Sequence, residues 1–571
     1  MQKIKEKIES LIERALEQIN IPAPEIVFSV PKQTVHGDLS TNIAMILAKE
    51  AKKPPRVLAE DLLRQMMPLP DWIEKAEIAG PGFINFFLKP HAYFNSLAMI
   101  MKEGKKFGST KKGKGEKIIL EFVSANPTGP LNVVSARAAA VGDTLANLLK
   151  AAGFKAHKEF YVNDVGNQIE LFAESLRARY LQALGKEAAI PEEGYQGEYL
   201  KRLGEKLARS SFRRTPESSH FKKVGLKKML DGQKKSLKRF GVVFDKWYLQ
   251  SDLIKKKKLQ KSLARLKKRG FLYEKEGAVF FRSTAFGDDK DRVVQKQDGE
   301  YSYFASDIAY HEDKFKRGVR VIDLFGPDHH GYVARTRASV AALGFDPEKL
   351  TILIIQQVNL LENEVVVKMS KRAGKLITMD DLLDEISPDV ARFFFLQRAS
   401  STPLDFDLAL AKKETPENPV YYIQYAHARI ASIFRKAKTV IPAKAGIQSL
   451  LDPDFRRDDE KVDLSLLTLP QEKELAKKLL QFPEVIAEAA KDLAAHHLPF
   501  YALELAKEFQ AYYSHAKQDA RYKVVDAENR PKTLAKLYLL KNIQIVLQNA
   551  LKLMGISAPE RMESKDVASP I

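Results

Sequence analysis

Hydrophobic and polar positions between residues 117 and 162 follow the order strand, loop, helix, strand. The apolar run from Ile118 to Val123 is typical of a buried strand. After a polar loop, apolar residues recur at steps of three and four from Val134 to Leu149, as on one face of a helix. Gly153 stands where a helix favours a left-handed terminating residue, and a second strand is expected from Ala156 to Val162. The pattern predicts the first unit of a parallel sheet, with an anion-binding helix start after the first strand.

The same pattern returns later in the chain. Strands are expected from Val319 to Phe325 and from Leu350 to Ile355, on either side of a helical segment that ends at Gly344. These segments predict the second half of a doubly wound α/β sheet, in which ligands bind outside the carboxyl ends of the strands. The loops that follow the strands are therefore expected to face one crevice.

These patterns divide the chain into several domains. Mixed helix and strand signals predict a small α+β domain over residues 1–104, and glycine and lysine dominate a linker, residues 105–116, that has almost nothing to bury. A Rossmann-type catalytic domain is expected over residues 117–405, with a helical insertion at about 170–250. An all-α domain follows over residues 414–562, interrupted by a loop-like insertion at 442–462, and the chain ends in a polar tail, 563–571.

Composition narrows the classes of partner and location. The 571 residues carry a net charge of +20 at pH 7, which favours a polyanionic partner such as nucleic acid; a lysine-heavy soluble surface is the alternative. The chain has no cysteine, which excludes disulfides and thiolate metal sites and fits a reducing, cytoplasmic location. No apolar run is long enough to predict a membrane span.

A second motif lies far downstream, at Lys368-Met369-Ser370-Lys371-Arg372. Cations on a glycine-tipped loop can fold over a triphosphate and neutralise charge as pyrophosphate leaves. Such a string alone is often just a basic turn. Together with the upstream strand, loop and helix it indicates a nucleotide-binding site.

Several segments together closely resemble arginyl-tRNA synthetase, a class I aminoacyl-tRNA synthetase family. The similarity runs from about residue 1 to Met562, through EFVSANPTGPL, EFYVNDVGNQ, FGDDKDRV, YFASDIAYHEDKF, GPDHHGYVAR, VKMSKRAG, NPVYYIQYAHARI and GISAPERM. The resemblance implies an N-terminal domain that touches the tRNA, a nucleotide-binding catalytic domain and a helical anticodon-binding domain. The implied reaction forms arginyl-adenylate from ATP and L-arginine, then transfers the arginyl group to the terminal ribose of tRNA(Arg). Mg²⁺ is expected with ATP, without a fixed protein metal site, and the expected protein is a monomer that needs bound tRNA for activation.

The resemblance also assigns an arginine pocket. A guanidinium offers a planar fork of donors that selects carboxylates. Asp307 is the carboxylate expected to bind it, beside Tyr303, and Glu121, Ser124 and Asn126 are expected in the same pocket. A helix cap or a surface acid is the alternative for Asp307, and its place at the crevice favours the pocket.

A further set of residues is assigned to ATP by the resemblance. The set is Pro127, Thr128, Gly129, Asn132, Val134, Ser135, His329, His330, Lys368, Met369 and Lys371. The residues expected to act in catalysis are Asn132, Ser135, Lys368, Ser370 and Lys371. The two histidines could instead form a metal pair, but no third ligand has suitable spacing. The turn at Asn163, Asp164 and Gly166 is expected to hold the loop after the second strand, or to be a plain turn.

One departure from the family concerns the phosphate loop. The family normally has His-x-Gly-His where this chain has Asn132-Val133-Val134-Ser135. Asn132 and Ser135 can donate hydrogen bonds but cannot carry a positive charge, and losing one transition-state donor can cost roughly a hundredfold in rate. Two hypotheses follow: an active synthetase with a modified phosphate loop, and a catalytically weak tRNA-binding relative. A generic nucleotidyltransferase would leave the helical C-terminal domain without a role.

The helical domain supplies candidate tRNA contacts. Aromatic side chains can stack on splayed bases, and cations can reach backbone phosphates. The candidates are Tyr421, Gln424, Tyr425, Arg429, Lys517 and Arg521. The helical spacing predicts that Tyr422 and Ala426 belong to the core instead.

Overall fold

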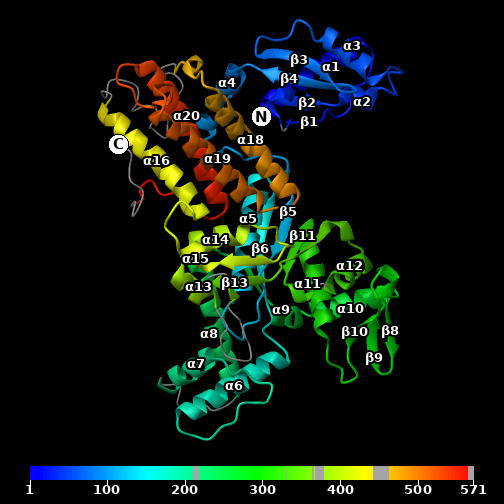
Figure 1. Ribbon diagram of the computed structural model, residues 1–571. Helices are drawn as coiled ribbons and strands as arrows, with labels where there is room; N and C mark the ends of the chain where they lie inside the picture. The colour runs from blue at the N-terminus through cyan, green and yellow to red at the C-terminus, as the bar shows by residue number, and fades with distance from the viewer. Residues whose placement is uncertain are drawn as a thin grey trace.

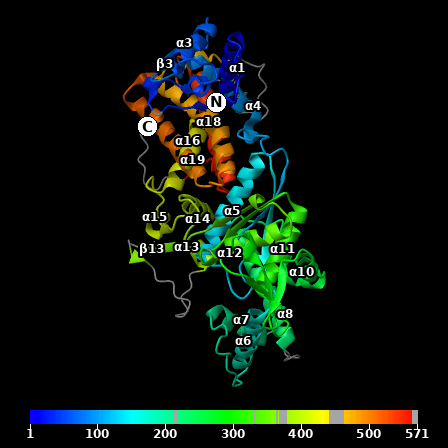
Figure 2. The ribbon, with the colours of Figure 1, turned by 90° about the vertical axis from the view of Figure 1, so that its right-hand side faces the viewer.

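In the computed structural model, the structure describes residues 1–31, 33–209, 218–329, 331–362, 365–366, 378–440 and 462–562. The N-terminal domain and a group of three helices, α6 to α8, lie at opposite ends of an elongated molecule, with the main sheet between them (Figure 1). The view turned by 90° gives the same order along the long axis (Figure 2).

The N-terminal domain packs helices against a small antiparallel sheet. Its sheet has the strand order β1-β2-β4-β3, and apolar residues of α1 such as Ile8 and Ile12 are fully buried. The elements are α1 (Gln2–Gln18), β1 (Phe28–Ser29), β2 (Leu39–Thr41), α2 (Ile43–Leu47), α3 (Pro55–Gln65), β3 (Ile73–Ala79) and β4 (Phe83–Leu88). Helix α4 (Pro90–Glu103) then leads to the rest of the chain.

The segment after α4 is packed and not simply solvated. The side chain of Phe107 is buried, and its ring stacks on Phe482 with 6.2 Å between centroids. The Asn549 amide donates a hydrogen bond to the Phe107 carbonyl at 3.1 Å. A single aromatic residue therefore anchors a stretch whose glycine and lysine content predicted little to bury.

The catalytic domain is built on a five-stranded parallel sheet. The strand order is β12-β11-β5-β6-β7, so the winding reverses at β5 and the predicted doubly wound fold is confirmed. The strands are β5 (Lys117–Glu121), β6 (Lys155–Val162), β7 (Lys246–Leu249), β11 (Arg320–Phe325) and β12 (Leu350–Ile354). The helices α5 (Val133–Ala151), α11 (Tyr303–Arg317) and α12 (Tyr332–Ala342) belong to the same domain.

Additional elements extend this domain. The three helices at the far end are α6 (Asn167–Ala183), α7 (Glu198–Arg209) and α8 (Ser218–Arg239). A second extension contains α9 (Gln250–Lys255), α10 (Lys258–Lys268) and an antiparallel sheet of β8 (Leu272–Lys275), β9 (Ala278–Phe281) and β10 (Arg292–Gln295). A third group comprises β13 (Val358–Glu362), β14 (Val365–Val366), α13 (Met379–Glu385), α14 (Pro388–Leu396), β15 (Leu404–Asp407) and α15 (Leu408–Lys412).

The C-terminal domain is helical among the residues that the structure describes. Its long helices are α16 (Pro419–Val440), α18 (Pro470–Lys491), α19 (His497–Ser514) and α20 (Arg530–Leu553). The end of α20 meets α5, where the Asn147 amide donates to the Leu553 carbonyl at 3.1 Å. No helix in the described part of the chain is long and apolar enough to cross a membrane.

Candidate active site

A cavity of about 960 Å³ opens at the carboxyl ends of β5, β6 and β11. Its walls come from the loop after β5, the first turn of α5, the turn after β6, the start of α11 and the loop after β11. The predicted site residues among its lining are Ser124, Asn126, Asn132, Val134, Ser135, Tyr303, Asp307 and His329. The fold therefore brings four of the five residues of the arginine set and four of the eleven residues of the ATP set to one place.

The chain turns sharply where β5 ends. Val123 and Ser124 both have positive φ angles, 71° and 38°, in a region that residues with a side chain seldom adopt. The Ser124 hydroxyl donates to a Glu121 carboxylate oxygen at 2.8 Å and accepts from the Tyr161 backbone amide at 3.0 Å. These two bonds hold the strained turn against the neighbouring strand.

The loop that follows is supported by α7 and α8. The Gln233 amide donates to the carbonyls of Asn126 and Gly129, at 3.1 and 2.9 Å. The Tyr199 hydroxyl donates to the Thr128 carbonyl at 2.6 Å. Pro127, Thr128 and Gly129 are absent from the residues that line the cavity, so their assigned role in ATP binding stays a prediction.

The first turn of α5 is capped by the two residues that replace histidines. The Asn132 side-chain oxygen accepts from the Ser135 backbone amide at 2.8 Å and from the Ser135 hydroxyl at 3.0 Å. The Ser135 hydroxyl therefore donates its hydrogen bond within the cap. The Asn132 side-chain nitrogen is still available to donate to a ligand. The positive end of the helix dipole, rather than a charged side chain, faces the cavity here.

The first described residues downstream of the second motif contact this same turn. Thr378 forms a β-bridge with Asn132, and the Met379 amide donates to the Leu131 carbonyl at 2.8 Å. Lys368, Met369, Ser370 and Lys371, like His330, lie outside the described residues, so their assigned roles stay predictions.

Asp307 and Tyr303 project from the first turns of α11 into the cavity. The Tyr303 hydroxyl packs over Gly166, where a side chain would be strained by the φ of 100° and its Cβ would lie 3.3 Å from that hydroxyl. Burial raises the pKa of Asp307 to about 6, and the neighbouring Glu121 adds to that effect while His311 opposes it. Because a cation would relieve this cost, Asp307 suits a guanidinium.

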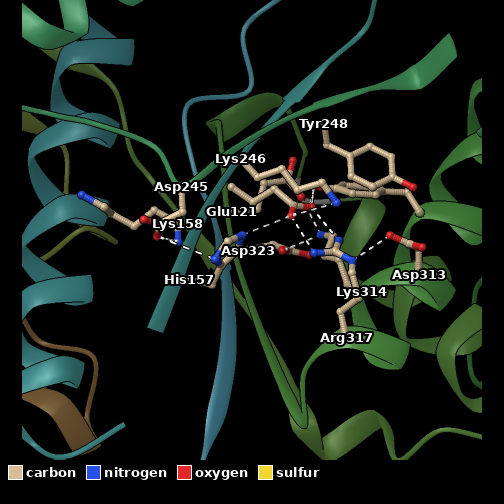
Figure 3. A network of polar contacts seen from close by, with 12 residues as sticks. Glu121, His157, Lys158, Asp245, Lys246, Tyr248, Asp313, Lys314, Arg317 and Asp323 are labelled. Atoms are coloured by element: carbon tan, nitrogen blue, oxygen red, sulfur yellow. Dashed lines mark hydrogen bonds and ion pairs between the residues drawn. The ribbon is translucent and has the colours of Figure 1, made fainter. Parts of the chain in front are cut away.

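Glu121 has a different environment from the one that the resemblance implied. Its carboxylate binds the ammonium group of Lys314 as well as the Ser124 hydroxyl, and Glu121 is absent from the cavity lining (Figure 3). Burial raises its pKa, and Lys314 opposes that shift. Direct contact between Glu121 and arginine stays a prediction. Glu121 accepts a hydrogen bond from Ser124, and Ser124 itself lines the cavity.

The charged network in Figure 3 has a simple origin in the strand register. Glu159, Glu121 and Asp323 are direct neighbours on β6, β5 and β11, so three carboxylates lie side by side on one face of the sheet. Helix α11 covers this row with Lys314, which binds Asp323 at 2.7 Å, and Arg317, which binds Glu159 through two bonds of 2.7 and 2.8 Å. The cations of one helix thus neutralise the acids of three strands.

His311 adds a further link between this row and the cavity. One ring nitrogen lies 2.8 Å from an Asp323 carboxylate oxygen, and the other lies 2.7 Å from the Asp307 carbonyl. The ring therefore fixes the backbone of the residue whose side chain faces the cavity.

His329 also lines the cavity. Its side chain is exposed, and its ring lies beside Phe325 and Tyr332, with ring centroids 5.6 and 4.8 Å away. Partial desolvation lowers its pKa, so the imidazole is neutral at pH 7. Among the described residues no group of three or more histidine, aspartate or glutamate side chains could hold a metal ion.

The candidate tRNA contacts lie in two places. On α16, Tyr421 and Tyr425 stack at 6.3 Å, and Arg429 binds Gln510 at 2.9 Å and also the Tyr425 hydroxyl. Gln424 instead joins domains, because its amide donates to Asp389 at 2.9 Å and to the Ser557 carbonyl at 3.0 Å. Lys517 and Arg521 are exposed near the end of α19. Ala426 is fully buried, as predicted, and Tyr422 packs partly buried against the same core.

Some cavity residues had no assigned role in binding. Asn163, Gln168, Asp328, Tyr332 and Gln357 also line the cavity. These residues lie just after a strand or near the start of a helix. That position could have indicated them from the sequence, because such segments meet at the carboxyl-end edge of a parallel sheet, where ligands bind.

Three family models match the chain. The arginyl tRNA synthetase N terminal domain matches residues 2–88, the catalytic domain of class I (R) tRNA synthetases matches residues 96–393, and the DALR anticodon binding domain matches residues 423–562.

Relatives match over nearly the whole length. An arginine–tRNA ligase of Geobacillus kaustophilus is 45% identical over 570 residues, covering 98% of this chain and 99% of the relative. Another, from Listeria monocytogenes, is 45% identical over 568 residues, with 98% of each covered. The solved structure of Thermus thermophilus arginyl-tRNA synthetase has a TM-score of 0.74 at 24% identity, covering 98% of this chain and 100% of that one, which supports the fold. The chain belongs to the arginyl-tRNA synthetase family of class I aminoacyl-tRNA synthetases.

Proposed function

We propose that this chain is an arginine–tRNA ligase that activates L-arginine with ATP and charges tRNA(Arg). The observation that carries the proposal is a cavity lined by two chemically distinct groups. Asp307 is a carboxylate with no ion pair among the described residues, and the start of α5 offers backbone amides to phosphate. The near full-length match to arginine–tRNA ligases supports the same activity.

Two transfers make up the reaction. The arginine carboxylate attacks the α-phosphorus of ATP, an oxygen–phosphorus bond forms, and the bond to the β-phosphate breaks to release pyrophosphate. The terminal ribose hydroxyl of the tRNA then attacks the arginyl carbonyl, and AMP leaves. ATP enters as its magnesium complex, and the side chains of this chain hold the reacting groups in line.

The phosphate loop works without histidines in this proposal. The Asn132 side-chain nitrogen and the first free amides of α5 donate to the phosphates, and the helix dipole favours their negative charge. The predicted cations of residues 368–372 would add the positive charge that the first motif lacks. Asn132 is thereby both a helix cap and a phosphate donor.

Transfer RNA is proposed to contact the helical C-terminal domain. The Tyr421 and Tyr425 rings offer stacking surfaces, and Arg429, Lys517 and Arg521 offer cations to phosphates. Gln424 is already bound to Asp389, so its proposed part is to hold α16 against the catalytic domain.

A charging assay tests the proposal. Purified protein with tRNA(Arg), radiolabelled L-arginine, ATP and magnesium should form arginyl-tRNA. A parallel reaction with Asn132→His/Val134→Gly/Ser135→His measures what the altered loop costs, and the absence of charging by both proteins would overturn the proposal. The weak tRNA-binding alternative requires normal tRNA affinity without ATP–pyrophosphate exchange, and the full-length match to ligases does not favour it.

A further inference from the structure

The segment between β5 and α5 has almost no hydrogen bonds of its own. In the part of the chain that the structure describes, no backbone amide of residues 125–131 donates to a carbonyl of the same segment. Two of its residues, Pro127 and Pro130, have no amide proton to donate. This segment nevertheless joins Asn126 to Asn132, and both of these residues line the cavity. Its conformation therefore depends on contacts from other elements.

Gln233 on α8 supplies two of these contacts. Its side chain is only 1% exposed, and its amide nitrogen donates to the Asn126 carbonyl at 3.1 Å and to the Gly129 carbonyl at 2.9 Å. A carbonyl oxygen can only accept, so the amide nitrogen is the atom that faces both carbonyls. One side chain thus fixes two points of the segment that lie three residues apart.

Helix α8 also reaches the far end of the segment, through α13. The Ser236 hydroxyl, three residues after Gln233 and so on the same side of α8, donates to the Asp380 carboxylate at 2.5 Å. At the start of α13, the Met379 amide donates to the Leu131 carbonyl at 2.8 Å. The segment is therefore held to α8 directly at one end and through α13 at the other.

These contacts decide where the Asn132 side chain and the first amides of α5 lie relative to a bound phosphate. Asn132 and Ser135 carry no positive charge, so this side of the cavity relies on hydrogen bonds, which weaken steeply when their geometry is poor. In a transfer between bound reactants, a misplacement of about 1 Å can cost about a hundredfold in rate. The rate should therefore depend on how firmly the segment is held.

We propose that Gln233 is a positioning residue for the reaction with ATP, which acts by fixing the backbone of residues 126–129 through its side-chain amide. This inference rests on the proposed function, because it assigns ATP to the cavity. Gln233 is absent from the cavity lining, so its effect reaches ATP through the segment that it holds. The guanidinium of arginine is expected at Asp307, on a different element, so arginine binding should respond less.

ATP–pyrophosphate exchange by the full-length protein, with tRNA(Arg) present, tests the inference. Gln233→Met keeps the length of the side chain but removes both donors. It should lower kcat/KM for ATP by about tenfold, the effect of losing a hydrogen bond of typical net strength, and change KM for arginine by less than about twofold. Asp231→Asn is the matched control, because Asp231 is exposed on the same helix two residues earlier, and it should change neither constant.

Tyr199→Phe is a second variant, for the case that Gln233→Met does not fold. It removes a single hydroxyl, which donates to the Thr128 carbonyl at 2.6 Å in the same segment. The remaining ring still fills its place, so the protein should fold. Because the segment then loses one of its outside donors, kcat/KM for ATP should fall severalfold, again with little change in KM for arginine.

Gln233→Glu distinguishes a donor from a side chain that only fills space. At about pH 6 its buried carboxyl is protonated and can donate to one of the two carbonyls, so exchange relative to wild type should lie above that of Gln233→Met. At about pH 9 the carboxylate can only accept, and the relative rate should fall to the level of Gln233→Met or below it. Equal relative rates of the two variants at both pH values would contradict the role of the amide as a donor.

The outcomes separate this inference from the proposed function. A wild-type protein that neither exchanges pyrophosphate nor charges tRNA contradicts both. An active wild-type protein, together with unchanged kcat/KM for ATP in Gln233→Met or Tyr199→Phe, contradicts the inference alone. A lower melting temperature with unchanged kinetic constants would assign Gln233 to stability only. Equal losses for ATP and for arginine would indicate a distorted cavity and also overturn the inference.

Discussion

The ammonium group of Lys314 lies between the carboxylates of Glu121 and Asp323, inside a sheet and helix contact that excludes water. Burial disfavours its charge, but the two carboxylates outweigh that effect and its pKa is raised. The two acids are neighbours in the strand register and would repel each other without it. The ion pairs of Lys314 therefore offset the repulsion that the strand register creates between these two carboxylates.

Lys314→Met should destabilise the protein strongly. Removing the cation leaves Glu121 with only the Ser124 hydroxyl and Asp323 with only the His311 ring, and breaking a buried pair in this way costs about 3–5 kcal/mol. Denaturant unfolding measures the change. Lys316→Met is the matched control two residues away, because Lys316 is 56% exposed and its partner Glu312 keeps Arg265 and Ser262 when Lys316 is removed, so the loss should be only about 0–1 kcal/mol. Equal effects of the two substitutions would contradict this account.

Arginine binding should weaken in acid through Asp307. Its carboxylate, with a pKa raised to about 6, is charged above that pH and neutral below it, and the charged form binds the guanidinium. Between pH 7 and pH 5 the dissociation constant for arginine should therefore rise by about tenfold. Titration calorimetry across that range measures it. Asp307→Asn should bind weakly at every pH with a flattened profile, and an unchanged pH dependence in that variant would show that Asp307 is not the titrating group.

Asp307 could be predicted from the sequence as a pocket residue, but the ion pairs of the residues around it could not. The family motif places an aspartate four residues after Tyr303, so the position of Asp307 in the crevice could be expected from the sequence. The pairing of Glu121 with Lys314 joins residues 193 positions apart and depends on which strands are adjacent. Hydrophobic periodicity carries no information on strand order, so this pairing could not be predicted.

At the scale of elements, β5 ends earlier than its apolar run predicts. The strand stops at Glu121, although Phe122 and Val123 continue the apolar pattern. The positive φ angles of Val123 and Ser124 break the extended backbone there, and the chain turns toward the cavity. Hydrophobicity predicted the strand and the helix α5, but it could not show the turn because the turn residues are themselves apolar or small.

The cap of α5 makes a separate prediction about Asn132. Asn132→Ala removes the acceptor for the Ser135 amide and should destabilise the protein by about 1 kcal/mol. Asn132→Asp keeps the cap and should retain stability, yet its negative charge repels the phosphates and should raise KM for ATP. Thermal unfolding and ATP–pyrophosphate exchange measure the two effects. If Asn132→Asp left KM for ATP unchanged, Asn132 would be a cap without a role at the phosphates.

At the scale of the whole molecule, Arg392 joins three parts of the chain. Its fully buried guanidinium donates to the Met554 carbonyl after α20, to the Phe240 carbonyl after α8, and to Asp143 on α5, at 2.6, 3.2 and 2.7 Å. Helix α5 begins at the phosphate loop, and α20 belongs to the helical domain. One side chain thus ties the nucleotide site to the domain proposed to bind tRNA.

Arg392→Leu should therefore lower stability and loosen the contact between the two domains. Asp143 would keep Lys158, at 2.8 Å, but would lose its arginine, and two carbonyls would lose their donor, so about 3–5 kcal/mol should be lost. Calorimetric scanning should show a broadened or split transition, because the helical domain no longer unfolds with the catalytic sheet. Arg398→Leu, at an exposed position six residues on, should change stability by no more than about 0.5 kcal/mol. A sharp single transition at the wild-type temperature in Arg392→Leu would show that apolar packing, and not this arginine, holds the domains together.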